Sequence, residues 1–182
     1  MRENLRRLDR EIASCQNDTY LFSHCLRSRA ELMQRMGASE DEIIAFWEQY
    51  RCHSAARSAL FAIYERTDPA AAIRLLLECR ESDASSRYDL IRHTQELIKL
   101  HQKTNQKQPY EQELRRLILE YGCLDIPYVS QLKAVTSQQD WPPMLDHLFK
   151  LVRTRNERLS LLHFEGMYQQ LLEQITQSHR LD

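Results

Sequence analysis

The chain has 182 residues, of which 42% are hydrophobic and 28% charged, and its formal net charge is −1. This composition excludes a mostly disordered chain, and the near-neutral charge gives no general reason to expect binding to nucleic acid or to acidic membranes. There are only three glycines, where an average usage of about 7% would give roughly thirteen. Such a low number disfavours β-hairpins, β-sandwiches and glycine-rich phosphate loops.

Targeting and redox signals are equally sparse. No apolar stretch approaches the roughly 20 residues that a membrane span needs, and the first residues, Met1 to Arg7, contain no apolar core of a signal peptide. The five cysteines are odd in number and form no CxxC pair, which favours reduced thiols acting as small core residues. We therefore expect a cytoplasmic protein that needs no cofactor and does not enter a membrane.

Apolar residues recur at helical spacing from the N-terminus onward. Gly37 fits a left-handed helix C-cap, and Ser39 with Glu42 forms a capping-box pattern that opens the next helix. A break is expected near Cys52 and His53. The apolar stripes of this N-terminal part cover residues 5–15, 21–36, 43–47 and 56–64.

The five prolines mark later helix starts, because proline has a fixed φ and lacks the N–H that a first turn leaves unbonded. They are Pro69, Pro109, Pro127, Pro142 and Pro143. The predicted helices are 69–81, 84–103, 109–121, 126–136, 142–153 and 156–176, the last with a possible break at Gly166.

These helices are expected to pair in chain order: 69–81 with 84–103, 109–121 with 126–136, and 142–153 with 156–176. The pairs begin 40 and 33 residues apart, a period typical of two-helix repeats such as the tetratricopeptide type. The predicted fold class is all-α, with stacked antiparallel helix pairs in a tetratricopeptide-like α-solenoid. An irregular helical bundle is the alternative.

We find no linker that would divide the chain, since the polar stretch 102–108 reads as a loop between helices. A single all-helical domain is therefore expected over residues 1–182. Within it, residues 1–66 form an N-terminal helical part and residues 67–178 a region of helix-pair repeats.

The second half of the chain has a recognisable pattern of apolar and aromatic positions. The segments that carry it are 72–79, 109–114, 128–133, 140–142 and 161–168. From Asp68 onward the sequence resembles the C-terminal helical region of bacterial SWIM zinc-finger proteins, which implies a tetratricopeptide-like stack. The CxC and CxH elements of the finger itself are absent, so the resemblance implies neither zinc binding nor nucleic-acid binding by a finger.

Motifs for catalysis are missing. None of the seven histidines has a glutamate three residues before it, which excludes the Glu-x-x-His pattern of helical di-iron sites and the HExxH zinc motif. The dipeptides His24-Cys25 and Cys52-His53 invite a zinc interpretation, but neighbouring residues on a helix point about 100° apart and would rarely reach one metal ion. We expect no metal site and no enzymatic activity.

Two groups of arginines occur near the N-terminus, and they suggest a second function. They are Arg2, Arg6 and Arg10 on one helix face, with Arg7 beside it, and Arg27, Arg29 and Arg35 further on. Such a stripe could bind phosphates. However, Arg7 lies four residues from both Glu3 and Glu11, a spacing that favours a solvated face with ion pairs.

We therefore expect a non-catalytic scaffold that binds a protein or peptide partner, with a nucleic-acid-associated accessory module as the alternative and the oligomeric state left open. In helical stacks the first helices of successive pairs line one face. On those helices the charged residues that point away from the expected core are Arg74, Glu78, Glu111, Arg115 and Lys150. They are the candidate partner-binding residues, while Trp47 and Trp141 are expected in the core.

Overall fold

The computed structural model describes residues 2–15 and 18–178, and within these ranges every regular element is helical. The prediction of an all-α protein is confirmed. None of the helices in this part of the chain is long and apolar enough to cross a membrane. The backbone divides into two compact units, residues 1–82 and 83–182, which are described separately.

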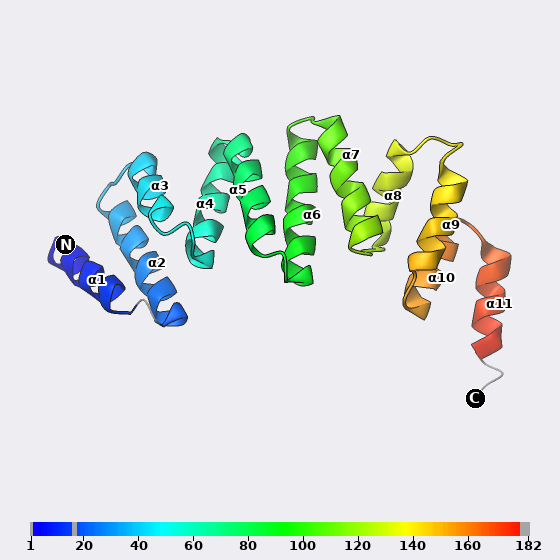
Figure 1. Ribbon diagram of the computed structural model, residues 1–182, viewed down its shortest axis with the longest axis horizontal. Helices are drawn as coiled ribbons and strands as arrows, with labels where there is room; N and C mark the ends of the chain where they lie inside the picture. The colour runs from blue at the N-terminus through cyan, green and yellow to red at the C-terminus, as the bar shows by residue number, and fades with distance from the viewer. Residues whose placement is uncertain (1, 16–17, 179–182) are drawn as a thin grey trace. The chain divides into compact units, whose positions relative to one another are not determined.

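The first unit contains five helices (Figure 1). Its helix starts follow from local chemistry. The Asp18 carboxylate accepts hydrogen bonds from the N–H groups of Tyr20 and Leu21, and Ser39 and Glu42 form the predicted capping box, so backbone donors without a helical partner are bonded. Gly37 follows the second helix with φ +81°. The helices are α1 (Arg2–Ser14), α2 (Thr19–Arg35), α3 (Glu40–Glu48), α4 (Ser54–Thr67) and α5 (Pro69–Ser82).

One core holds these five helices together. Leu26 of α2, Ala56 and Leu60 of α4 are fully buried in it, and Leu75 of α5 joins the same cluster. Trp47 is 4% exposed, as expected for a core residue. Because α2 and α4 both contribute central residues, they form the middle of the unit, with α1 packed on α2 and α5 packed on α4.

The second unit continues with six α-helices and one π-helical segment. Figure 1 shows α6, α7 and α8 alternating in direction along the chain. The segment η1 extends α7 with wider turns, in which Tyr121 N–H bonds to the Arg116 carbonyl. The elements are α6 (Arg87–Lys103), α7 (Lys107–Arg115), η1 (Arg116–Glu120), α8 (Ile126–Val135), α9 (Trp141–Leu151), α10 (Arg155–Phe164) and α11 (Tyr168–Ser178).

The core of the second unit lies where η1, α8, α9 and α10 meet. Ile118, Leu132, Leu148 and Leu161 are almost completely buried there. Trp141 is 8% exposed in the same cluster, so the second tryptophan is also a core residue, as predicted.

Most helix boundaries match their predictions within a few residues. The proposed break at Gly166 is confirmed, because α10 ends at Phe164 and Gly166 has φ +70°. The predicted N-terminal part ends near residue 66, whereas the compact units divide after Ser82. The predicted pair 69–81 and 84–103 lies across that division, and the single domain and solenoid stack stay predictions.

Candidate partner-binding surfaces

The candidate residues Arg74 and Glu78 both lie on the exposed side of α5, in the first unit. Arg74 is 3.9 Å from the Asp68 carboxylate, a loose contact between exposed groups. Glu78 is engaged far more closely, by Arg51 in the turn between α3 and α4. Glu78 is therefore committed to an interaction within its own unit.

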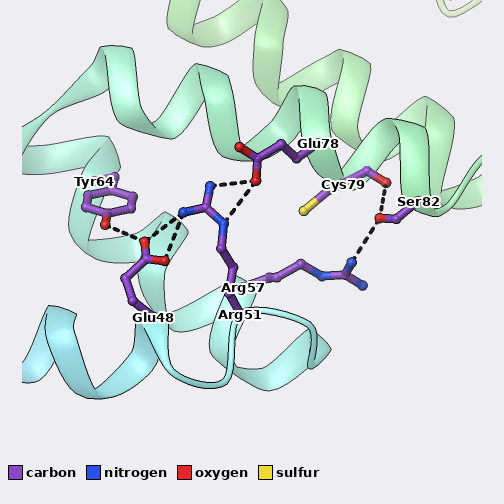
Figure 2. A network of polar contacts seen from close by, with 7 residues as sticks. All are labelled: Glu48, Arg51, Arg57, Tyr64, Glu78, Cys79 and Ser82. Carbon is purple, nitrogen blue, oxygen red and sulfur yellow. Dashed lines mark hydrogen bonds and ion pairs between the residues drawn. The ribbon is translucent and has the colours of Figure 1, made fainter.

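Arg51 is the centre of a polar network, shown in Figure 2. Its Nη1 donates to both carboxylate oxygens of Glu48, at 2.8 and 2.9 Å. Its Nε and Nη2 donate to Oε2 of Glu78, at 2.9 and 2.6 Å. The network thus ties the end of α3 to the middle of α5, with one guanidinium bonded to two carboxylates.

Tyr64 of α4 completes the network by donating its hydroxyl to Glu48 at 2.8 Å. Burial, followed by this hydrogen bond, raises the pKa of Tyr64 to about 12. Figure 2 also shows Arg57, whose guanidinium donates to the Ser82 hydroxyl at 3.0 Å. Glu48, Arg51 and Glu78 keep about a third to over half of their side-chain surface exposed, so solvent weakens each ion pair and the network stabilises the unit modestly.

The other three candidates lie in the second unit. Glu111 and Arg115 bond to each other along α7, with Nε and Nη2 of Arg115 at 3.0 and 2.9 Å from Oε1 of Glu111. Lys150 is exposed in the last turn of α9. The five predicted residues therefore belong to two separately described units, and their grouping as one binding site stays a prediction.

A more continuous feature of the second unit is a row of three shallow depressions, which we call the α6–α8–α10 track. The first, about 450 Å³, lies around the α6–α7 turn, and the second, about 430 Å³, lies between α6 and α8. The third, about 410 Å³, lies between α8, α10 and α11. Gln102 lines the first two, and Ile126 lines the second and third, so the depressions adjoin one another.

The track has an apolar floor with a few polar groups. The Tyr110 hydroxyl donates to Oε1 of Gln131 at 2.9 Å, which fixes both side chains at the wall. Burial raises the pKa of the Tyr128 phenol above its ordinary value of 10. The middle depression is lined by Ile98, Lys99, Gln102, Ile126, Tyr128 and Gln131, among others.

Of the predicted residues, only Glu111 lines the track, at its first depression. Helical spacing in the sequence is a signal for other residues that line the track. Lys99 and Gln102, like Tyr128 and Gln131, are three residues apart, which places each pair on one helix face. The sequence predicts a binding face on the helices that begin each pair, whereas α6 and α8 are the second helices of their predicted pairs.

The two His–Cys dipeptides do not form a shared site. Cys25 is buried in the first core next to Cys15, and burial raises the pKa of its thiol, as expected of a core cysteine. Cys52 is exposed, and the His53 ring packs against Phe22 with ring centroids 4.5 Å apart. In the part of the chain that the structure describes, no group of three or more His, Cys, Asp or Glu residues is placed to hold a metal ion.

The arginine groups near the N-terminus are partly committed to ion pairs. Arg7 pairs with Glu11 at 3.4 Å, and Arg29 pairs with Asp9 at 2.5 Å, which fastens α2 to α1. The side chain of Arg2 lies outside the described residues. Arg6, Arg10, Arg27 and Arg35 are exposed.

Comparisons with known proteins identify no relative. No family model matches the chain, no curated protein matches it, and no solved structure resembles it to a significant degree.

Proposed function

We propose that this chain is a non-catalytic helical module that binds an extended segment of a partner protein along the α6–α8–α10 track. The observation that carries the proposal is the continuity of the three depressions through Gln102 and Ile126. Each has a volume in the range of ligand-binding clefts, and a row of them suits an elongated ligand better than a small molecule.

The chemistry of the lining supports a peptide as the occupant. Ile98, Ile126 and the ring of Tyr128 offer apolar contact area, while the side-chain amides of Gln102 and Gln131 can both donate and accept hydrogen bonds. A peptide presents that combination of apolar side chains and backbone polar groups. Tyrosine supplies contact area with little conformational freedom to lose, which favours recognition surfaces.

The repeat architecture belongs to this proposal. Successive antiparallel helices that stack in the manner of tetratricopeptide repeats would place α6, α8 and α10 in one layer. The α8–α10 packing and the depression shared by α6 and α8 support that order within the second unit.

A selection from a random peptide library on the intact protein tests the proposal, with affinities then measured on two variants by isothermal titration. Gln102→Arg places a bulky cation where two depressions meet. Gln138→Arg makes the same change at an exposed position outside the track. We expect Gln102→Arg to weaken the selected peptides at least about tenfold, a loss of about 1.4 kcal/mol, and Gln138→Arg to change their affinity less than twofold.

The proposal fails if no peptide is enriched or if both variants bind the enriched peptides as tightly as the unaltered chain. It also fails if the purified chain is a dimer in solution that Gln102→Arg converts to a monomer. In that case the track would be covered by a second copy of the chain.

A further inference from the structure

The connection between η1 and α8 is the point at which two arginines from distant parts of the second unit meet. Two backbone hydrogen bonds, both 3.1 Å long, close the end of η1. Tyr121 N–H donates to the Arg116 carbonyl, and Cys123 N–H donates to the Leu117 carbonyl. Between them lies Gly122, with φ +63°. The positive φ favours glycine, and its missing side chain leaves space above the backbone.

That space is bordered by two guanidinium groups. Arg87, the first residue of α6, donates from Nη2 to the Tyr121 carbonyl. Arg153 comes from the connection between α9 and α10. A Cβ built on Gly122 would lie 3.5 Å from Nη2 of Arg87 and 3.8 Å from Nη2 of Arg153. The two nitrogens therefore lie no farther apart than the sum of these distances.

Two like charges at this separation repel each other. The C-terminal end of a helix supplies only about half an elementary negative charge, less than the two positive charges of Arg87 and Arg153. In the described residues neither guanidinium forms an ion pair with a carboxylate. Both side chains are exposed, so their remaining N–H donors are accessible.

Three nearby carboxylates have hydrogen-bond or ion-pair partners of their own. One of them, Glu157, also interacts electrostatically with Arg153, which contributes to its lowered pKa after the backbone hydrogen bonds that it accepts. Glu157 accepts hydrogen bonds from the backbone N–H groups of Arg153 and Thr154, at 2.8 and 2.9 Å, as part of a capping box. Asp125 accepts a contact from the Cys123 thiol at 3.5 Å. Glu120 lies 3.5 Å from Arg116. These carboxylates moderate the local positive charge without bonding to either guanidinium.

We infer that Arg87 and Arg153 form a binding site for a small oxyanion, a phosphate or a carboxylate group, over Gly122. Guanidinium groups match the geometry of both anions through paired N–H donors, and an anion between the two cations removes their repulsion. The site is independent of the peptide proposal, since it uses none of the residues that line the track.

Titration of the ¹⁵N-labelled protein with inorganic phosphate, and separately with acetate, tests the inference by NMR. The three glycines give a small set of backbone signals, and Gly37 and Gly166 serve as internal controls. We expect a saturable shift of the Gly122 amide and of the Arg87 and Arg153 side-chain Nε–H signals. Sodium chloride at matched ionic strength should not reproduce it. The anion that saturates at lower concentration identifies which oxyanion the site prefers.

Arg153→Gln removes one cation without removing the Arg87–Tyr121 bond, and we expect it to weaken binding at least about tenfold. Arg158→Gln is the matched control, because Arg158 is exposed on α10 and its guanidinium lies over the Phe149 ring, 5.7 Å from its centre; this variant should bind as the unaltered chain does. The inference is wrong if the shift is linear with concentration, if chloride produces it equally, or if Arg153→Gln retains full affinity.

Discussion

The two compact units differ in where their arginines find carboxylate partners. In the first unit, arginines join separate helices: Arg29 pairs with Asp9, Arg51 with Glu48 and Glu78, and Arg66 with Glu40 at 2.6 Å. In the second unit, Arg115 pairs along its own helix, and Arg87 and Arg153 both lie close to Gly122. The cation that joins two helices there is a lysine, Lys133 of α8, which pairs with Glu165 at 2.9 Å.

The consequence is a difference in what each unit can offer a partner. Cations that join helices within a unit cannot bind elsewhere without breaking those contacts. The second unit leaves two guanidiniums and a row of depressions accessible. Both proposals place binding in the second unit, although the first unit also has exposed arginines, Arg6, Arg10, Arg27 and Arg35. Matched changes in the two units test that distinction.

The largest expected effect comes from cavities in the two cores. Leu60 and Leu132 are fully buried, one in each unit, so Leu60→Ala and Leu132→Ala should each lower the free energy of unfolding by about 2–5 kcal/mol. Hydrogen exchange followed by mass spectrometry should show faster exchange mainly in residues 19–79 for the first variant and in 107–164 for the second. If each variant instead increases the rate of hydrogen exchange equally in both units, the two units unfold together.

The glycines that follow α2 and η1 provide the next comparison. Gly37 and Gly122 both have positive φ, but an added Cβ at Gly37 meets nothing within 4 Å, whereas at Gly122 it meets both guanidiniums. Each change to alanine should lower the free energy of unfolding, measured by urea denaturation, by about 1–2 kcal/mol, because alanine is strained in a left-handed backbone conformation. Only Gly122→Ala should also weaken oxyanion binding, and an equal loss in Gly37→Ala would contradict the proposed site.

A smaller effect is expected from the ion pairs. A double-mutant cycle with Arg51→Gln and Glu78→Gln should give a coupling energy of about 0.5–1 kcal/mol, because both groups are partly exposed. The matched cycle with Glu111→Gln and Arg115→Gln should give about 0.3–0.5 kcal/mol, typical of a pair within one helix. If the coupling energy of Glu111 and Arg115 exceeds that of Arg51 and Glu78, the ion pair of the first unit is not the stronger of the two.

The last effect is confined to alkaline pH. The pKa of Tyr64 is raised to about 12 from its ordinary value of 10, so the folded state favours the protonated phenol. The resulting stability is fully present below pH about 10 and is lost as the pH rises toward 12. Over that range, thermal unfolding of Tyr64→Phe should depend less on pH than that of the unaltered chain. The control Tyr20→Phe changes a residue that is 85% exposed and should leave the pH dependence as it was.

The sequence by itself determined the local structure. The capping box at Ser39, the helix starting at Pro69 and the break at Gly166 were predictable, because helix ends depend on backbone hydrogen bonds and dihedral angles of neighbouring residues. The burial of Trp47 and Trp141 was predictable from apolar periodicity. The capping box of Thr154 and Glu157 carries the same sequence signal and could have been found in the same way.

Only the tertiary structure decided which distant side chains meet. The Arg51–Glu78 contact, the approach of Arg87 to Arg153 and the depressions joined at Gln102 each depend on how helices pack. Helical periodicity tells which face of a helix is apolar, but it does not tell which neighbour covers that face or where a turn places its side chains. For this reason the ion pair between Arg51 and Glu78 and the track on α6 and α8 became visible only in three dimensions.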